Sequence, residues 1–83
     1  EFAVIVPHHE EAAAAERADA FRIGLGAVVV VPERTDLRVR VSIGVGAFDA
    51  TRHGNADHFL SEVDGALYRA KGGGRDRVCR ASV

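Results

Sequence analysis

The chain has 83 residues, enough for one small domain, and a formal net charge of −1, which gives no overall field to attract nucleic acid or an anionic membrane. Its 47% hydrophobic and 28% charged residues are typical of a globular domain, and no apolar run approaches the ~18 residues needed to cross a bilayer. The lone Cys79 excludes an internal disulfide and fits a reducing compartment, so we expect a cytoplasmic location.

The first part of the chain predicts a strand, a helix and a second strand. Residues 2–7, FAVIVP, form a short apolar run rich in β-branched side chains, typical of a strand buried on both faces. Residues 27–31, AVVVV, predict another buried strand, and residues 32–36, PERTD, predict a turn. Between the strands, an alanine-rich helix is expected over about residues 10–25. Four of its residues recur at helical spacing on one face: Ala14, Ala18, Phe21 and Leu25.

Residues 37–48, LRVRVSIGVGAF, alternate strictly between apolar and other residues and predict one long strand. Between Arg40 and Phe48, the second face of this strand carries the small residues Ser42, Gly44 and Gly46. A face of this kind usually lies against another backbone or a ligand.

The last part of the chain predicts a loop, a helix and a terminal strand. The loop over residues 49–55 ends in Asn55, which is typical of a helix N-cap. The residues RVCRASV at the end of the chain predict a short strand. The helix is expected over about residues 56–71. It should bury five residues on one face: Phe59, Val63, Ala66, Leu67 and Ala70.

The predicted order is therefore β-α-β-β-α-β in one domain over residues 1–83, and the fold class is α/β in the α+β sense. We expect an antiparallel or mixed sheet with both helices packed against it, and residues 27–31 and 37–48 paired as an antiparallel hairpin. The same order occurs in ferredoxin-like domains, which have many functions. Element order alone leaves open an independent ferredoxin-like interaction domain.

Residues 66–78, ALYRAKGGGRDRV, are the strongest candidate for a functional site. A helical run ends at Lys71, and three glycines separate it from Arg75. Such glycines let the backbone turn sharply after a helix. The stretch is either a glycine C-cap beside two solvated cations, or a phosphate site. In a phosphate site, Lys71 would supply a mobile ammonium charge and Arg75 a planar guanidinium that can donate two hydrogen bonds to one phosphate.

Histidine and aromatic residues give weaker signals. No basic and aromatic residues interleave on a sheet face, so we expect no nucleic-acid partner, and we place Phe59 and Tyr68 in the core. The four histidines have no cysteine beside them, and we expect them to be solvated loop side chains. They are His8, His9, His53 and His58.

Three stretches, in chain order, resemble three signatures of the GGDEF family. They are EFAVIVP (residues 1–7), VSIGVGAF (41–48) and DGALYRAKGGGRDRV (64–78). That family comprises the diguanylate cyclases, which condense two GTP molecules into cyclic di-GMP. Glu1 and Phe2 resemble the last two letters of the motif that names the family. The resemblance extends along the whole chain and corresponds to the C-terminal half of such a domain.

The resemblance implies roles for individual residues. Lys71 and Arg75 would contact the triphosphate of bound GTP. Glu1 would be a catalytic residue and a ligand of Mg²⁺, because the acids of the motif hold the magnesium ions that activate a ribose hydroxyl and neutralise phosphates. Other positions are implied to be structural: Ser42, Gly44, Gly72, Gly73 and Gly74.

Two features depart from the family pattern. Asp76 stands where the family usually has asparagine, which places an extra negative charge beside the triphosphate contacts. The connection HHEEAAAAER is shorter than usual. Arg17 falls near a residue that contributes to product inhibition in some members, but because of this shortening its role stays unassigned.

Three functions remain open. The chain could be part of a diguanylate cyclase domain, with GTP and cyclic di-GMP as ligands, Mg²⁺ as cofactor and a second copy as partner. It could be a degenerate GGDEF domain that acts as a nucleotide sensor or dimerisation module, or the independent ferredoxin-like interaction domain. The family's metal-binding aspartate and guanine contacts have no counterpart among the 83 residues, so we expect the chain alone to be inactive.

We also expect residues 2–7 to expose an apolar edge that promotes association.

Overall fold

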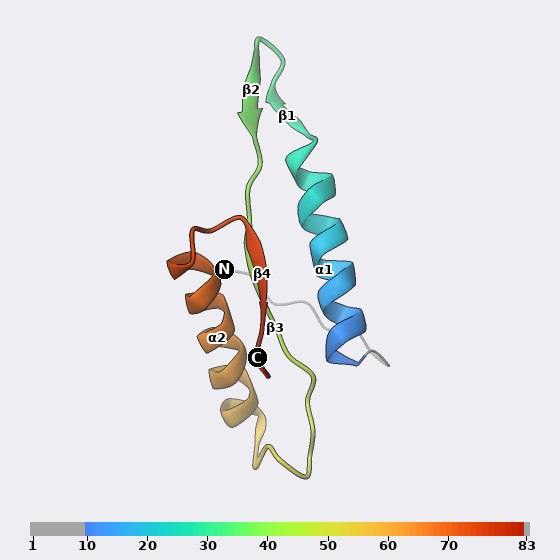
Figure 1. The fold of residues 1–83 in the computed structure, drawn as a ribbon, viewed down its shortest axis with the longest axis vertical. Coiled ribbons are helices and arrows are strands. Elements are labelled where there is room, and N and C mark those ends of the chain that lie inside the picture. The colour runs from blue at the N-terminus through green and yellow to red at the C-terminus, as the bar shows by residue number, and fades with distance from the viewer. Residues whose placement is uncertain (1–9, 83) are drawn as a thin grey trace.

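The computed structural model describes residues 10–82, and Figure 1 shows how their helices and strands are arranged. The strand predicted at residues 2–7 lies outside the described residues, and so do His8 and His9. The chain has the mixed α/β character that the sequence predicts. In chain order, the elements are α1 (Glu11–Gly26), β1 (Val29–Val31), β2 (Arg34–Arg38), β3 (Ser42–Val45), α2 (Ala56–Gly72) and β4 (Arg77–Arg80).

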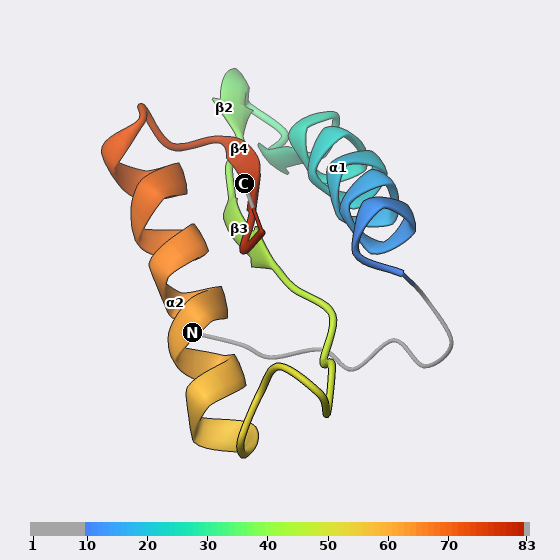
Figure 2. The same ribbon diagram turned by 60° about the horizontal axis from the view of Figure 1, so that its bottom comes forward.

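The centre of the described structure is a parallel pair of strands, β3 and β4. Their register runs from Ser42 opposite Arg77 to Val45 opposite Arg80. Figure 2 shows α1 and α2 on opposite sides of this pair, as does Figure 1. Both helices therefore pack against the same two strands. Within the described part of the chain, no helix is long and apolar enough to cross a membrane.

Within residues 10–82 the strands form two separate pairs, so the predicted single antiparallel or mixed sheet is not confirmed in that part of the chain. β1 and β2 make an antiparallel hairpin, with Val29 opposite Arg38 and Val31 opposite Arg34. Figure 1 shows this hairpin projecting beyond the ends of β3 and β4. The predicted turn over residues 32–36 is also too long, because β2 already begins at Arg34.

The single strand predicted over residues 37–48 is wrong as well. Its first residues belong to β2, residues 39–41 are outside any strand, and β3 begins at Ser42. The physical reason is a change of partner: β2 pairs with β1, whereas β3 pairs with β4. A chain that leaves one ladder of hydrogen bonds for another interrupts its strand, although the alternation of side chains continues through the break.

Helix α2 forms as its sequence predicts. The side chain of Asn55 accepts a hydrogen bond from the His58 backbone N–H at 2.9 Å, and Asp57 lies in the first turn, where the helix dipole favours an acid. The inner face buries Ala66 and Ala70 completely, while the larger residues of that face are half-buried: Phe59, Val63 and Leu67. Tyr68 is 78% exposed, so its expected place in the core is wrong.

Gly44 of β3 lies against the backbone of α2, and Gly46, just after β3, lies against side chains. A Cβ atom added to Gly44 would lie 2.5 Å from the Val63 carbonyl oxygen and 2.6 Å from the Leu67 nitrogen. At Gly46 it would lie 2.9 Å from the Val63 side chain. Glycine at these positions lets helix and strand approach more closely than any other residue would.

Helix α1 is covered less well than its pattern predicts. Ala14, Ala18 and Leu25 are half-buried, but Phe21, on the same predicted face, is 62% exposed. Two strands are too narrow to cover the face of a helix of 16 residues, so the larger side chain has no surface to pack against in the described structure.

Candidate functional site

The turn after α2 is the site that the sequence predicts. The helix ends with Gly73 as C-cap, whose N–H donates to the Arg69 carbonyl at 2.8 Å. The Arg75 N–H donates to the Ala70 carbonyl at 2.9 Å, and Gly74 between them has a φ of +119°. A bond from the second residue past the cap to the third residue before it, across a positive-φ residue, is a Schellman motif. The glycine C-cap interpretation is therefore correct in geometry.

The three glycines are not equivalent. Gly74 is required by its φ, and a Cβ there would also lie 2.7 Å from the Arg77 guanidinium. At Gly73 a Cβ would lie 2.9 Å from the same guanidinium and 3.1 Å from the Arg69 carbonyl oxygen. Gly72 is the last helical residue, and a Cβ there would meet nothing within 4 Å. The turn thus needs the positive φ of Gly74 and leaves little room for a side chain at Gly73, whereas Gly72 has open space around it.

The two cations of the predicted phosphate site lie at the same end of α2. Lys71 is in the last helical turn and Arg75 is on the turn that follows, and both are exposed. Lys71 lines an open depression of about 190 Å³ together with Asp64, Leu67 and Tyr68. Within residues 10–82, neither cation forms an ion pair, so both charges face solvent. They are available to an anion without first breaking a contact in that part of the chain.

The turn continues in the left-handed region beyond the glycines. Arg75 has a φ of 64° and Asp76 a φ of 47°. The Asp76 carboxylate accepts hydrogen bonds from Arg22 Nη1 at 3.1 Å and from Arg40 Nη1 at 3.3 Å. The extra negative charge expected beside the triphosphate contacts is therefore paired with two arginines, one from α1 and one from the segment before β3.

Arg22 is held on two sides. Its Nε donates to Asp19 at 2.8 Å, in addition to the bond with Asp76. Hydrogen bonds with Asp19 and Asp76 raise the pKa of Arg22 above its ordinary value. Arg22, Arg40 and Asp76 line a second depression, of about 300 Å³, between α1 and the chain leading into β3.

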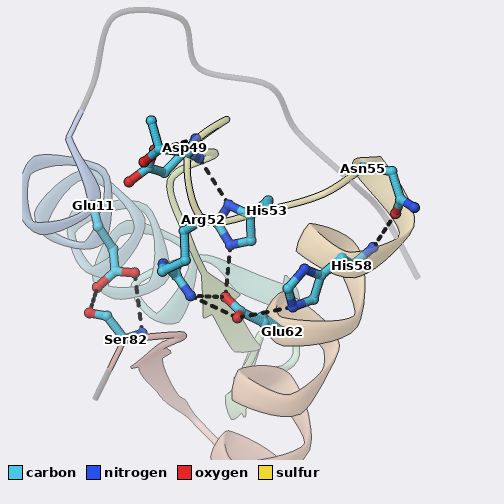
Figure 3. Close-up of polar contacts among 9 residues, drawn as sticks. Glu11, Asp49, Arg52, His53, Asn55, His58, Glu62 and Ser82 are labelled. Carbon is cyan, nitrogen blue, oxygen red and sulfur yellow. Dashed lines mark hydrogen bonds and ion pairs between the residues drawn. The ribbon is translucent and has the colours of Figure 1, made fainter.

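His53 is a functional candidate that the sequence interpretation missed. It is only 2% exposed, so its description as a solvated loop side chain is wrong. Figure 3 shows it between the Asp49 backbone and Glu62. Its Nδ1 accepts the Asp49 N–H at 2.9 Å, so Nε2 carries the proton that is donated to Glu62 Oε2 at 2.9 Å. This pair of bonds ties the loop before α2 to the helix itself.

Several groups surround the same histidine. The rings of Phe48 and Phe59 lie 5.5 and 5.1 Å from its ring, and Arg52 donates twice to Glu62, at 2.8 and 3.0 Å. Hydrogen bonds from His53 and then from Arg52 lower the pKa of Glu62 below its ordinary value. His58 lies four residues before Glu62 on α2, a spacing that the sequence interpretation overlooked, and the His58 Nε2 and Glu62 Oε1 atoms lie 3.7 Å apart. No signal in the sequence pointed to His53 itself.

Residues 10–82 contain no group of three His, Cys, Asp or Glu side chains that could hold a metal ion. The described residues by themselves therefore offer no cluster of that size to a metal ion. Glu1, the ligand that the family resemblance implies, lies outside the described residues. Of the positions implied to be structural, Gly44 packs on α2, and Ser42 starts the pairing of β3 with β4.

The comparison with protein families gives one match. The profile described as "Diguanylate cyclase, GGDEF domain" matches residues 1–77 of the 83-residue chain. No solved structure matches the chain. The matched residues include β3, α2 and the turn with Lys71 and Arg75, which are the parts that resemble the family signatures. The chain therefore belongs to the GGDEF family, whose domains are of the diguanylate cyclase type.

Proposed function

We propose that this chain supplies the triphosphate-binding end of a diguanylate cyclase domain, and that Lys71 and Arg75 hold the phosphates of GTP. The observation that carries this proposal is the placement of both cations at one end of α2, exposed and without an ion pair in the described part of the chain. A triphosphate needs compensating positive charge, which a mobile ammonium and a planar guanidinium supply in complementary ways.

The helix itself does not favour an anion at this end. The C-terminus of a helix carries a partial negative charge, unlike the N-terminus at which many proteins bind phosphate. The two side chains therefore have to provide the attraction. Lys71 is stable there in the absence of ligand, since a cation in the last turn of α2 interacts favourably with the dipole.

Domains of the GGDEF family use Mg²⁺, which supplies charge stabilisation to the phosphates when it is bound. Glu1 is the residue of this chain to which we assign metal binding and catalysis. The residues described in the structure offer no metal cluster of their own. The roles we derive for them are accordingly binding and orientation: Lys71 and Arg75 hold phosphate oxygens, and the Schellman turn fixes where Arg75 leaves the helix end.

By itself, the 83-residue chain should not form cyclic di-GMP. Joining two GTP molecules needs a metal site, a guanine pocket and two facing copies of the domain, and each stabilises the transition state in a way that the others cannot replace. The second copy is the partner that we propose. Of the groups that the resemblance assigns to chemistry, the chain has Glu1, Lys71 and Arg75. Losing one preorganised charge contact alone commonly costs ~10²-fold or more in rate.

The binding role is tested by measuring GTP affinity of the purified chain at several salt concentrations. We expect weak, salt-sensitive binding, because exposed charges are screened. Lys71→Ala and Arg75→Ala should each weaken binding about three- to tenfold. Arg17→Ala removes the same charge from an exposed position of α1 and is the matched control, for which we expect no change beyond that of net charge. Equal affinities for all variants would contradict the proposal.

The absence of turnover is tested separately, by chromatography of reaction mixtures that contain the chain, GTP and Mg²⁺. We expect no cyclic di-GMP. Product formed by the purified chain would contradict this part of the proposal and leave the binding role unaffected.

A further inference from the structure

Asp76 connects three segments of the fold that are distant in sequence. Each of its two carboxylate oxygens accepts a hydrogen bond from a different arginine: Oδ1 from Arg22 of α1 at 3.1 Å, and Oδ2 from Arg40 at 3.3 Å. Asp76 itself lies on the turn between α2 and β4. We call these three residues the Asp76 clamp.

The turn held by this clamp has an unfavourable backbone. Arg75 and Asp76 both have positive φ, which is uncommon for residues other than glycine. Aspartate is among the residues that tolerate this conformation, whereas arginine has no such preference. The conformation at Arg75 is therefore imposed by its surroundings: the bond from the Arg75 N–H to Ala70 on one side, and the clamp on the other.

The two arginines of the clamp differ in how firmly they are held. The side chain of Arg22 is 21% exposed and also bonded to Asp19, so its guanidinium is fixed on α1. The side chain of Arg40 is 71% exposed and contributes less, because solvent weakens an exposed ion pair. Arg22 is accordingly the main anchor of the turn.

We propose that Asp76 is a positioning residue for triphosphate binding, which acts by anchoring the turn to α1 through Arg22 and so fixing the direction in which Arg75 meets the phosphates. This proposal rests on the proposed function of Lys71 and Arg75. It predicts that removing the charge of Asp76 weakens GTP binding, which is the opposite of what a simple electrostatic effect predicts. If Asp76 only repelled the triphosphate, removing its charge would tighten binding.

The test uses Asp76→Asn, Arg22→Gln and the double variant of the 83-residue chain, with GTP as the probe. Asparagine tolerates positive φ, so the first variant removes the charge without straining the backbone. Glu33→Gln, at an exposed position in the turn between β1 and β2, makes the same change of net charge and is the control. Two readouts are compared: GTP affinity, and the rate of hydrogen exchange at the Arg75 amide, which is bonded to Ala70.

We expect Asp76→Asn and Arg22→Gln each to weaken GTP binding about threefold or more and to speed exchange at Arg75. The double variant should be no worse than the stronger single variant, because both changes remove the same contact. Exchange in the middle of α2, for example at Ala66, should stay as in the unchanged chain, which separates a loosened turn from general unfolding.

Three results would overturn the proposal. They are tighter GTP binding by Asp76→Asn, unchanged exchange at Arg75, and faster exchange with unchanged affinity. Failure of the proposed function is distinguishable from these. If the unchanged chain bound no GTP, the role of Lys71 and Arg75 would be wrong, whereas the exchange rates would still decide whether Asp76 anchors the turn.

Discussion

At the scale of single residues, the polar contacts of this domain join segments that the sequence keeps apart. His53 links the Asp49 backbone to Glu62 of α2, and Glu11 at the start of α1 accepts hydrogen bonds from Arg80 and Ser82 near the end of the chain. Burial opposes ionisation of Glu11, but its hydrogen bonds with Ser82 and Arg80 outweigh that effect and lower its pKa. The carboxylate of Glu11 thus stabilises the fold more when it is ionised than when it is protonated.

The contribution of an ionised carboxylate to stability can be tested at Glu62. Hydrogen bonds from His53 and Arg52 lower its pKa in the folded chain, so its contribution to stability is present above the unfolded pKa of about 4.3 and is lost as the pH falls through the lower folded value. We therefore expect the free energy of unfolding to decrease as the pH falls below about 4.3. Glu62→Gln should make this decrease shallower, measured by urea unfolding at a series of pH values.

The control for that experiment is Asp64→Asn, which removes a charge from an exposed residue in the middle of the same helix. Its pH dependence should stay close to that of the unchanged chain. An identical pH dependence for the unchanged chain and Glu62→Gln would show that the bonds to His53 and Arg52 do not favour the ionised form.

At the scale of elements, the contact between β3 and α2 depends on one glycine. A side chain at Gly44 would meet the backbone of α2 at 2.5 Å, and neither the Val63 carbonyl nor the Leu67 nitrogen can move without displacing the helix. We expect Gly44→Ala to lower the free energy of unfolding by about 3 kcal/mol, the upper end of the usual cost of overpacking. Thermal or urea unfolding checks this value.

Gly65 offers a matched comparison in the same pair of elements. A Cβ there would meet only the flexible end of Arg69, at 3.7 Å, which is an ordinary contact. Gly65→Ala should stabilise α2 by about 0.5–1 kcal/mol, because alanine is the better helix former. Equal effects of the two substitutions would mean that the close approach at Gly44 is not what limits this position.

The end of α2 permits a similar comparison. Gly74→Ala should cost about 1–2 kcal/mol, since alanine is strained at a φ of +119°. Gly72→Ala should be neutral or stabilising, because the residue is helical and its side chain would meet nothing within 4 Å. Unfolding of the two variants in urea checks the difference. If Gly72→Ala were the more harmful change, the Schellman geometry at Gly74 would be wrong.

At the scale of the whole molecule, the described structure has a small core. Its buried apolar residues are Val45, which is 9% exposed, and Ala66 and Ala70, which are fully buried. In residues 10–82, the parallel sheet has two strands, each with one unpaired edge. Parallel sheets usually contain more strands, covered on both faces, and an open edge is a template for pairing with another chain.

We therefore expect the chain to associate as its concentration rises, by pairing of strand edges or exchange of elements. Residues 2–7, outside the described part, provide an apolar run that suits the same pairing. Light scattering over a series of concentrations measures the effect. A monodisperse monomer throughout that series would contradict the expectation.

Part of the candidate site could be predicted from the sequence, and part became visible only in the structure. Lys71, Arg75 and the glycines between them stand within one short stretch, so their proximity could be predicted from spacing alone. The partners of Asp76 could not, because Arg22 and Arg40 lie 54 and 36 residues earlier in the chain. The burial of His53 was missed for the same reason, since it depends on how the loop folds back onto α2.

The sequence by itself determined the elements whose signals are local. The N-cap at Asn55, the buried face of α2 and the close approach at Gly44 follow from capping chemistry, helical spacing and side-chain size. The tertiary structure alone decided where residues 37–48 break between two partners, and which acids meet which arginines. Alternation of side chains describes a strand but not its neighbour, and an ion pair between distant residues exists only after the chain has brought them together.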